Sequence, residues 1–261
     1  MLHLLKIEWL KIKNYKAFWF FAIFYLVSIF LINYIGWSLN QRLVADKPIA
    51  DAILQQPYAF PKVWKTVGWM SSWLLYFPGM LFIMLMVNEF NFKTHRQNVI
   101  DGLSRDQFVS VKLVLAAVFA VVITLINGIT AVIFGSMTSG SFGIEGMQYL
   151  GYVFLQSVAY IFFALMLSVL FRRSGIAIIV FIIYGLIVEW LITAVATFEL
   201  KLAPAGYFLP LQVSDVLLPI PFGDEMIYPN LPHVGVLIGA IMLYITAYVF
   251  FARRKFVHDD L

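Results

Sequence analysis

Long apolar runs alternate along this chain with shorter polar stretches. A membrane-spanning helix needs roughly 20 predominantly apolar residues, so the pattern predicts six spans, at residues 17–35, 64–87, 113–132, 149–171, 176–195 and 234–251. Hydrophobic residues make up 62% of the chain and charged residues only 12%, a composition that a soluble protein of this size could not bury in its own core. We therefore predict an all-α integral membrane protein that forms a single transmembrane domain over residues 1–261.

The first 16 residues are basic and carry an apolar stripe at helical spacing, formed by Leu2, Leu5, Trp9 and Ile12. This pattern favours an N-terminal helix lying on the membrane surface, although the segment could equally be the basic flank of the first span. The apolar run at 17–35 is longer than the roughly 7–15 residues of a signal-peptide core, so we expect an uncleaved span.

The Lys and Arg residues fix the expected orientation. Thirteen of them fall on the side of the membrane that bears the N-terminus, namely Lys6, Lys11, Lys13, Lys16, Lys93, Arg96, Arg105, Lys112, Arg172, Arg173, Arg253, Arg254 and Lys255. Five fall on the other side, namely Arg42, Lys47, Lys62, Lys65 and Lys201. Cytoplasmic loops carry the excess of Lys and Arg, so both termini are expected in the cytoplasm of a multi-pass protein of the cell (inner) membrane.

The polar stretch at residues 88–112, between the second and third spans, is the longest such interruption on the cytoplasmic side. Gly102 can end a helix in a left-handed conformation. Ser104 can cap the next helix, with Gln107 three residues later completing a capping box and Asp106 in the first turn. The stretch predicts a helix, a sharp elbow and a second helix that continues into the third span.

Two further features of the spans and loops are expected from proline. The Pro78-Gly79 pair should kink the second span, since proline lacks the backbone N–H that the helix needs. Residues 196–232 hold six prolines yet remain apolar. Because irregular backbone survives at membrane depth only where protein or water surrounds it, this outer segment should be partly re-entrant or packed on the spans.

Several kinds of chemistry are absent from the sequence. It has no GxxxxGK[ST] phosphate loop, no GxSxG or HExxH motif, no metal-ligand cluster and no cysteine,. We predict no catalytic residue, no metal and no cofactor on this chain, and no nucleic-acid partner.

Three polar residues lie within predicted spans. Glu189 is the one carboxylate deep in an apolar run, which makes it a candidate for the translocation pathway, although an interface anchor or a structural hydrogen bond would explain it too. Asn127 and Gln156 are further pathway candidates, with helix-packing hydrogen bonds as the alternative.

The chain resembles the six-span permease subunits of type-2 ABC exporters. The likeness is most specific in the elbow, at Glu89, Thr94 and the run LSRDQFVSVK from Leu103 to Lys112. A second likeness is the apolar, proline-bearing outer segment before the last span.

The resemblance implies a function and partners. In that family the elbow is a coupling helix that docks on a separate cytoplasmic ATPase, which binds ATP and Mg²⁺, and two permeases pair within the lipid membrane around the pathway. The implied coupling residues are Glu89, Asn98, Asp101, Gly102, Ser104 and Arg105. The alternatives are a secondary transporter or channel, or a membrane anchor for a multiprotein assembly.

Overall fold

The computed structural model describes residues 2–46, 56–94, 97, 102–221, 228 and 230–258. All regular elements in these ranges are helical. The longer helices are α1 (Leu2–Lys13), α2 (Lys16–Asp46), α4 (Val63–Ser72), α5 (Tyr76–Asn91), α7 (Arg105–Ser139), α8 (Gln148–Phe171), α9 (Ser174–Ile183) and α14 (Val234–His258). The shorter ones are η1 (Tyr184–Val188), α10 (Glu189–Ala194), η2 (Val195–Glu199), α11 (Ala203–Gly206) and α12 (Gln212–Asp215).

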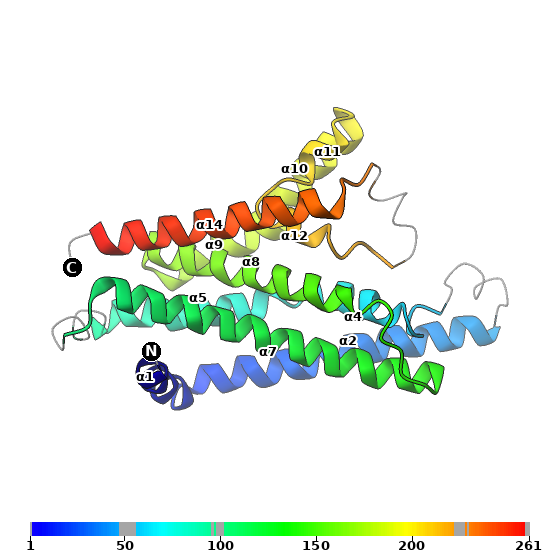
Figure 1. The fold of residues 1–261 in the computed structure, drawn as a ribbon, viewed down its shortest axis with the longest axis horizontal. Helices are drawn as coiled ribbons and strands as arrows, with labels where there is room; N and C mark the ends of the chain where they lie inside the picture. The colour runs from blue at the N-terminus through cyan, green and yellow to red at the C-terminus, as the bar shows by residue number, and fades with distance from the viewer. Residues whose placement is uncertain are drawn as a thin grey trace.

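The long helices form an elongated bundle around α8 (Figure 1). Helix α8 contacts α4, α5, α7, α9 and α14. Most residues in the apolar stretch of α8 are buried, whereas most of those in α2, α14 and the stretch Ser174–Glu199 are partly or fully exposed. A helix that is apolar all round is stable only inside a protein or a bilayer. The exposed helices therefore require an apolar surrounding.

Four of the six predicted spans lie inside a single helix, namely α2, α7, α8 or α14, whereas the second covers α4, α5 and the break between them and the fifth covers α9, η1 and α10. Within the described ranges, five helical stretches are long and apolar enough to cross a membrane, and a sixth is obtained when α4 and α5 are taken as one bent span. The helices extend beyond the predicted apolar runs, most clearly α7, which has 35 residues. The prediction of an all-α membrane protein is confirmed.

The second span is kinked, as predicted, and the kink lies just before the Pro78-Gly79 pair. Helices α4 and α5 meet at an angle of 48° across Trp73–Leu75. Pro78 lies in the first turn of α5, where it cannot donate a hydrogen bond to the carbonyl of Leu74 and its ring would clash there. The break therefore occurs one turn before the proline. Gly79 instead serves packing, since a Cβ there would lie 2.5 Å from the ring of Phe181.

The fifth span contains two π-helical turns, η1 and η2, which the sequence pattern did not indicate. Such turns often occur at functional sites. At Gly185 in η1, a Cβ atom would lie 2.4 Å from the hydroxyl oxygen of Tyr76. Only glycine lets these two spans approach this closely.

The outer segment before the last span packs on the bundle, as predicted. Its helix α12 contacts α8 and α14. Six apolar side chains in this segment are buried, namely Tyr207, Leu211, Val213, Val216, Leu217 and Leu218. Two tyrosines of α14 hold it further, because Tyr244 donates a hydrogen bond to the carbonyl of Phe208 and Tyr248 donates one to that of Pro210.

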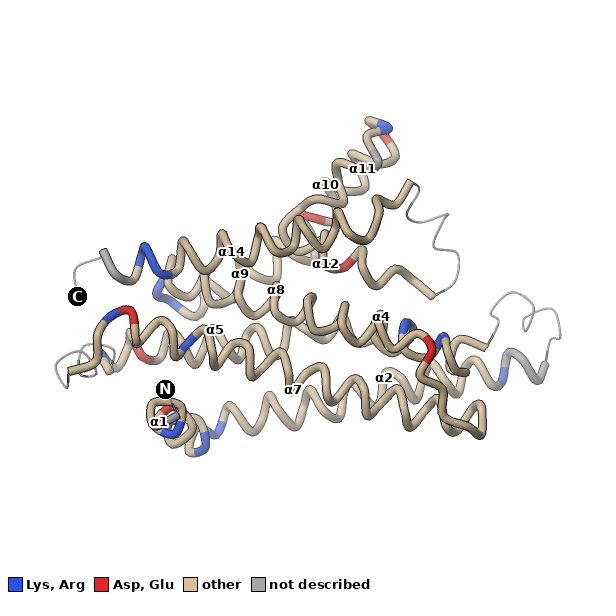
Figure 2. The backbone as a smooth tube through the Cα atoms, viewed as in Figure 1, with Lys and Arg blue, Asp and Glu red and all other residues tan. Residues whose placement is uncertain are grey.

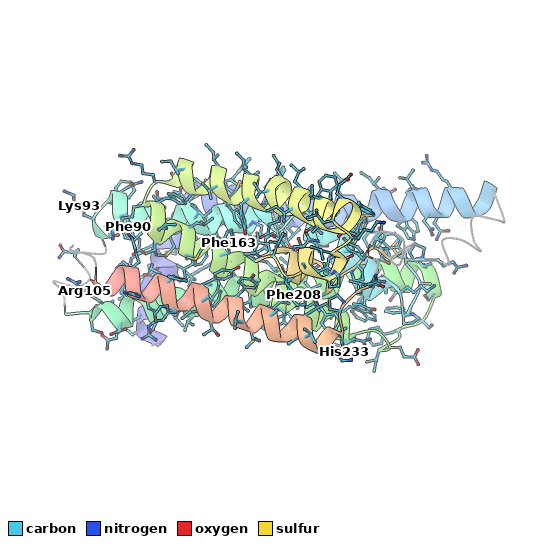
Figure 3. All side chains as sticks on the ribbon, turned by 90° about the horizontal axis from the view of Figure 1, so that it is seen from above. Phe90, Lys93, Arg105, Phe163, Phe208 and His233 are labelled. Atoms are coloured by element: carbon cyan, nitrogen blue, oxygen red, sulfur yellow. The ribbon has the colours of Figure 1, made fainter. Side chains whose placement is uncertain are left out.

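The two ends of the bundle differ in charge. The end that carries α1, the connection between α5 and α7, and the last turns of α14 is called here the elbow end; the opposite end is the far end. Figure 2 shows Lys and Arg gathered at the elbow end. Figure 3 shows Lys93 and Arg105 there, and His233 toward the far end.

Helix α1 is separate from α2 and is seen nearly end-on in Figure 1, across the direction of the bundle. The predicted apolar stripe matches its packing only in part. Ile12 is buried, but Trp9 is 50% exposed, and the buried face also holds the carboxylate of Glu8. A charged residue thus takes a place on the packed face of α1.

Candidate functional site

The turn into α7 has the predicted local geometry. Gly102 has a φ of +98°, which favours glycine,. The Ser104 hydroxyl accepts a hydrogen bond from the backbone N–H of Gln107, and the Gln107 side chain accepts one from the N–H of Ser104. This reciprocal cap starts α7 at a defined residue, and the helix then continues to Ser139.

A buried cluster of four charged side chains joins three helices at the elbow end. It consists of Glu8 and Lys11 from α1, Glu89 from the last turn of α5 and Lys112 from the second turn of α7; it is called here the ion cluster. Lys11 Nζ lies 2.9 Å from Glu8 Oε1 and 3.2 Å from Glu89 Oε1. Lys112 Nζ donates to Glu8 Oε2 and to Glu89 Oε1. The two ammonium groups thus alternate with the two carboxylates.

Burial and charge act against each other in the ion cluster. Glu8, Glu89 and Lys112 are all less than 10% exposed. Burial disfavours the charged form of Glu8, but the charges and hydrogen bonds of Lys112 and Lys11 outweigh it and hold the pKa of this carboxyl below its usual value,. Burial likewise opposes the charge on Lys11, and Glu89 and Glu8 together raise the pKa of its ammonium group. Both groups are therefore ionised at neutral pH.

The ion cluster makes α1, α5 and α7 one unit at the elbow end. Separating these helices would leave buried charges unpaired, which is strongly destabilising. An exposed ion pair, with Arg253 Nη2 2.9 Å from Asp106 Oδ1, connects the end of α14 to the start of α7. The Phe108 and Phe256 rings, stacked with centroids 4.7 Å apart, join the same two helices.

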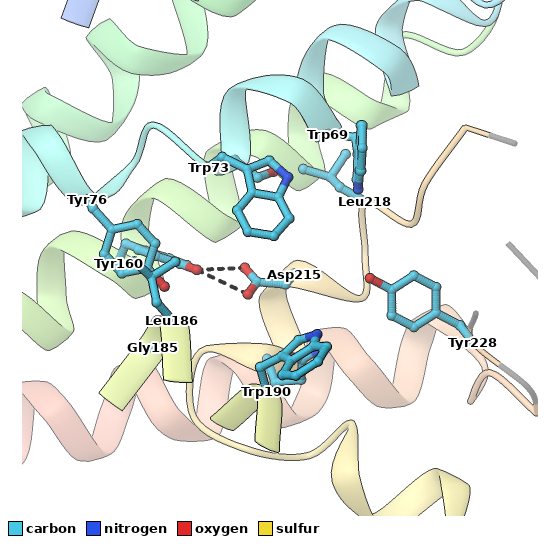
Figure 4. A pocket seen from close by; sticks show the side chains of 12 residues that line it. Trp69, Trp73, Tyr76, Tyr160, Gly185, Leu186, Trp190, Asp215, Leu218 and Tyr228 are labelled. Carbon is cyan, nitrogen blue, oxygen red and sulfur yellow. Dashed lines mark hydrogen bonds between the residues drawn. The ribbon is translucent and has the colours of Figure 1, made fainter. Parts of the chain in front are cut away.

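A second candidate site is a cavity of about 340 Å³ past the middle of the bundle (Figure 4). It is lined mainly by aromatic side chains and is called here the aromatic cavity. The lining residues are Trp69, Ser72, Trp73, Tyr76, Tyr160, Gly185, Leu186, Trp190, Gln212, Asp215, Leu218 and Tyr228. They come from the break between α4 and α5, from α8, from the π turn η1 and the start of α10, and from the outer segment.

Asp215 is the one charged residue among these described lining residues. Its Oδ1 accepts hydrogen bonds from Gln156 Nε2 at 2.8 Å and from the Tyr160 hydroxyl at 2.9 Å. Ser72 donates to Gln156 Oε1 at 3.0 Å, which fixes the orientation of that amide. The network links α4, α8 and α12 through the cavity wall.

The comparisons with known proteins bear on both sites. The family model described as "ABC-2 family transporter protein" matches residues 4–198. The chain belongs to this family. It is therefore the membrane-spanning permease of an ABC transporter. The elbow and the first five spans lie almost wholly within the matched region, whereas most of the outer segment and the last span, α14, lie beyond it. No curated protein matches the chain.

The coupling residues expected in this ABC-2 permease are found in different surroundings. Glu89 is buried in the ion cluster. Gly102 and Ser104 are exposed and Arg105 is partly buried. Asn98 and Asp101 lie outside the described residues.

The three polar residues of the spans also differ from one another. Gln156 is 1% exposed and binds Asp215 at the aromatic cavity. Asn127 is equally buried, donates to the carbonyl of Ile123 on its own helix α7, and does not line the cavity. Among the described residues, no group of three or more His, Asp or Glu could hold a metal ion.

Glu189 contacts backbone rather than the cavity. Its carboxylate accepts hydrogen bonds from the backbone N–H of Leu211, at 3.0 Å, and of Gln212, at 2.6 Å. These are N–H groups at the start of α12, which have no partner inside that helix. Of the alternatives that the sequence left open, this geometry matches the structural hydrogen bond.

Sequence reasoning missed Asp215 as well as the pairing of Lys112 with Glu8 and Glu89. Lys112 entered only as a cation at a span end and as the last residue of the run LSRDQFVSVK. Asp215 is the one carboxylate between Leu209 and Phe222, within the apolar, proline-bearing segment that was expected to pack on the spans. That context is the signal that could have singled it out.

Proposed function

We propose that this permease couples ATP hydrolysis on a separate subunit to export of a substrate across the membrane. A cytoplasmic ABC ATPase, which holds ATP and Mg²⁺, docks on the elbow around residues 92–105. Closure of the ATPase moves the elbow, and the connected helices transmit that movement to the pathway between the spans.

The observation that carries the proposal is the mechanical continuity from the elbow into the bundle. Helix α7 begins at the Ser104 cap and runs without a break for 35 residues. The ion cluster fixes its second turn to α5 and α1. A force on the elbow would therefore move these three helices together instead of bending the turn.

The proposed orientation has the elbow end in the cytoplasm. Thirteen of the 18 Lys and Arg residues belong to that end by sequence position, as the positive-inside rule requires. Helices α1 and α14, which carry the two chain ends, both reach it (Figure 1). We place the protein in the cell (inner) membrane with both termini in the cytoplasm.

A second permease, either another copy or a homologue, completes the transporter in this proposal. The exposed apolar side chains of α2, such as Phe20, Ile23 and Leu26, suit contact with lipid or with another apolar helix face. Close packing between the two permeases would place the pathway at their interface.

A crosslinking experiment tests the docking of the ATPase. Because the chain has no cysteine, a single-cysteine variant reacts at one position of the permease, and the wild type serves as the control for reaction of other proteins. Gln97→Cys places a thiol at an exposed position in the elbow, and Glu145→Cys places one at an exposed position at the far end. In native membranes a thiol-directed photocrosslinker should capture an ATP-binding subunit from Gln97→Cys and not from Glu145→Cys. Capture from neither or from both would contradict the proposal.

A further inference from the structure

The aromatic cavity has the chemistry to hold a positive charge on an apolar molecule. Three tryptophans and three tyrosines line it, and Figure 4 shows Asp215 among Trp73, Trp190 and Tyr228. The faces of aromatic rings attract cations, Trp most strongly. A carboxylate at the same place adds direct charge attraction.

The negative charge of Asp215 has no partner of opposite sign in the described part of the chain. No Lys, Arg or His there forms an ion pair with it. Gln156 and Tyr160 satisfy its hydrogen bonds but bring no charge. A carboxylate in apolar surroundings is costly without a counter-ion, and the cavity leaves room for one.

The volume limits what could enter. Ligand pockets range from about 300 to 1,000 Å³, and this cavity, at about 340 Å³, is at the small end. It suits a quaternary or protonated amine with one or two apolar substituents, or a single such group of a larger molecule.

We propose that the aromatic cavity binds an organic cation that carries apolar groups, with Asp215 as its counter-ion and the Trp73 and Trp190 rings against it. That this class of molecule is the transported substrate rests on the proposed function. The binding itself does not, because it requires only the permease.

The alternative is a purely structural role for Asp215, and the experiment must distinguish that role from cation binding. In that case its hydrogen bonds to Gln156 and Tyr160 simply hold α12 against α8. The variant Asp215→Asn keeps an oxygen acceptor for these donors but removes the charge. It would therefore preserve the anchor and weaken cation binding.

The test uses the purified full chain in nanodiscs and equilibrium dialysis. The probes are benzyltrimethylammonium and neopentylbenzene, which have the same shape but differ in charge. For the cation, we expect the Kd to rise about tenfold or more in Asp215→Asn, the loss of one close charge partner. The neutral probe should bind the two proteins alike, and the thermal stability should be similar.

A second pair of variants tests the aromatic contribution. Trp73→Leu should raise the Kd for the cation about two- to fivefold, the effect of one cation–π contact. Trp9→Leu, which changes an exposed tryptophan on α1, should leave it unchanged.

Two results would overturn the inference: equal cation binding by the wild type and Asp215→Asn, or equal binding of the charged and neutral probes by the wild type. Neither result touches the proposed coupling to an ATPase. Conversely, Arg105→Ala, which is expected to lose that coupling, should bind the cation with the wild-type Kd, so the two proposals fail separately.

Discussion

Glu189 is a buried carboxylate that accepts hydrogen bonds from backbone N–H groups. It accepts from the N–H groups of Leu211 and Gln212, and so attaches the outer segment to the fifth span. Glu189→Ala would leave both donors buried without a partner, at a cost of about 1–3 kcal/mol. We expect a drop in the unfolding temperature in detergent of about 2–4 °C per kcal/mol. Glu189→Gln, which keeps an acceptor, should lose much less, and equal losses would contradict the assignment.

Gly185 is required by the close approach of the fifth span to Tyr76. An alanine Cβ at this position would lie 2.4 Å from the Tyr76 hydroxyl oxygen, so Gly185→Ala should displace a wall of the aromatic cavity and destabilise the fold by about 1–3 kcal/mol. Gly151→Ala in α8 is the matched control, because no atom lies within 4 Å of the added Cβ. Alanine there should stabilise the helix by about 0.5–1 kcal/mol. Thermal unfolding distinguishes the two, and a Gly185→Ala protein as stable as the wild type would contradict the packing.

Residues whose role is local could be predicted from sequence, and those whose role is long-range could not. The Ser104 cap and the left-handed Gly102 depend on neighbours within three residues, and both were predicted. Asp215 depends on Gln156, which lies 59 residues away. No periodicity or spacing pairs residues at such a distance. Only the packing of the outer segment on α8 brings them together.

At the scale of elements, the ion cluster joins three packed helices, α1, α5 and α7, into one mechanical unit. Lys112→Met would remove the buried ammonium group that bridges Glu8 and Glu89. Loss of one partner of a buried ion pair costs about 3–5 kcal/mol. We expect a large loss of thermal stability in detergent, whereas Lys13→Met, at an exposed position on α1, should change stability by less than about 0.5 kcal/mol. Similar effects of the two variants would show that the cluster does not hold the helices together.

The same cluster should make stability depend on pH. Because the pKa of Glu8 is lower in the folded protein than its ordinary value of 4.5, the folded state favours the ionised form. Its contribution is complete above pH 4.5 and is lost as the pH falls below that value through the lowered pKa. Thermal unfolding from pH 7 to pH 3 should therefore show a smaller acid-induced loss for Glu8→Gln than for the wild type. Parallel curves would contradict this.

The elements themselves were largely predictable because each span is a long apolar run. The details that were not predictable concern contacts between spans. The break lies one turn before Pro78, at the carbonyl of Leu74, which Pro78 cannot reach with a backbone N–H donor. The π turns η1 and η2 bring no change of hydrophobic pattern with them. The buried face of α1 includes Glu8 because Lys112 on another helix neutralises it, which no stripe of apolar residues indicates.

At the scale of the whole molecule, the structure separates two regions with different chemistry. The elbow end is charged, capped and cross-linked by ion pairs. The aromatic cavity, past the middle of the bundle, is lined mainly by aromatic side chains, with Asp215 as the one charged residue among its described lining residues. Helices α5 and α7 begin or end at the elbow, and α5 also reaches the cavity through Tyr76. A movement of the elbow would thus reach the break in the second span, where the cavity is formed.

The most direct test of this account is the rate of ATP hydrolysis by the partner ATPase in proteoliposomes, measured with and without this permease. We predict that the wild-type permease changes the rate severalfold, and that Arg105→Ala and Asp101→Ala each abolish this effect while Glu145→Ala, at the far end, retains it. A rate that is independent of the permease, or equal responses to all the variants, would contradict the account. So would transport by the purified permease alone.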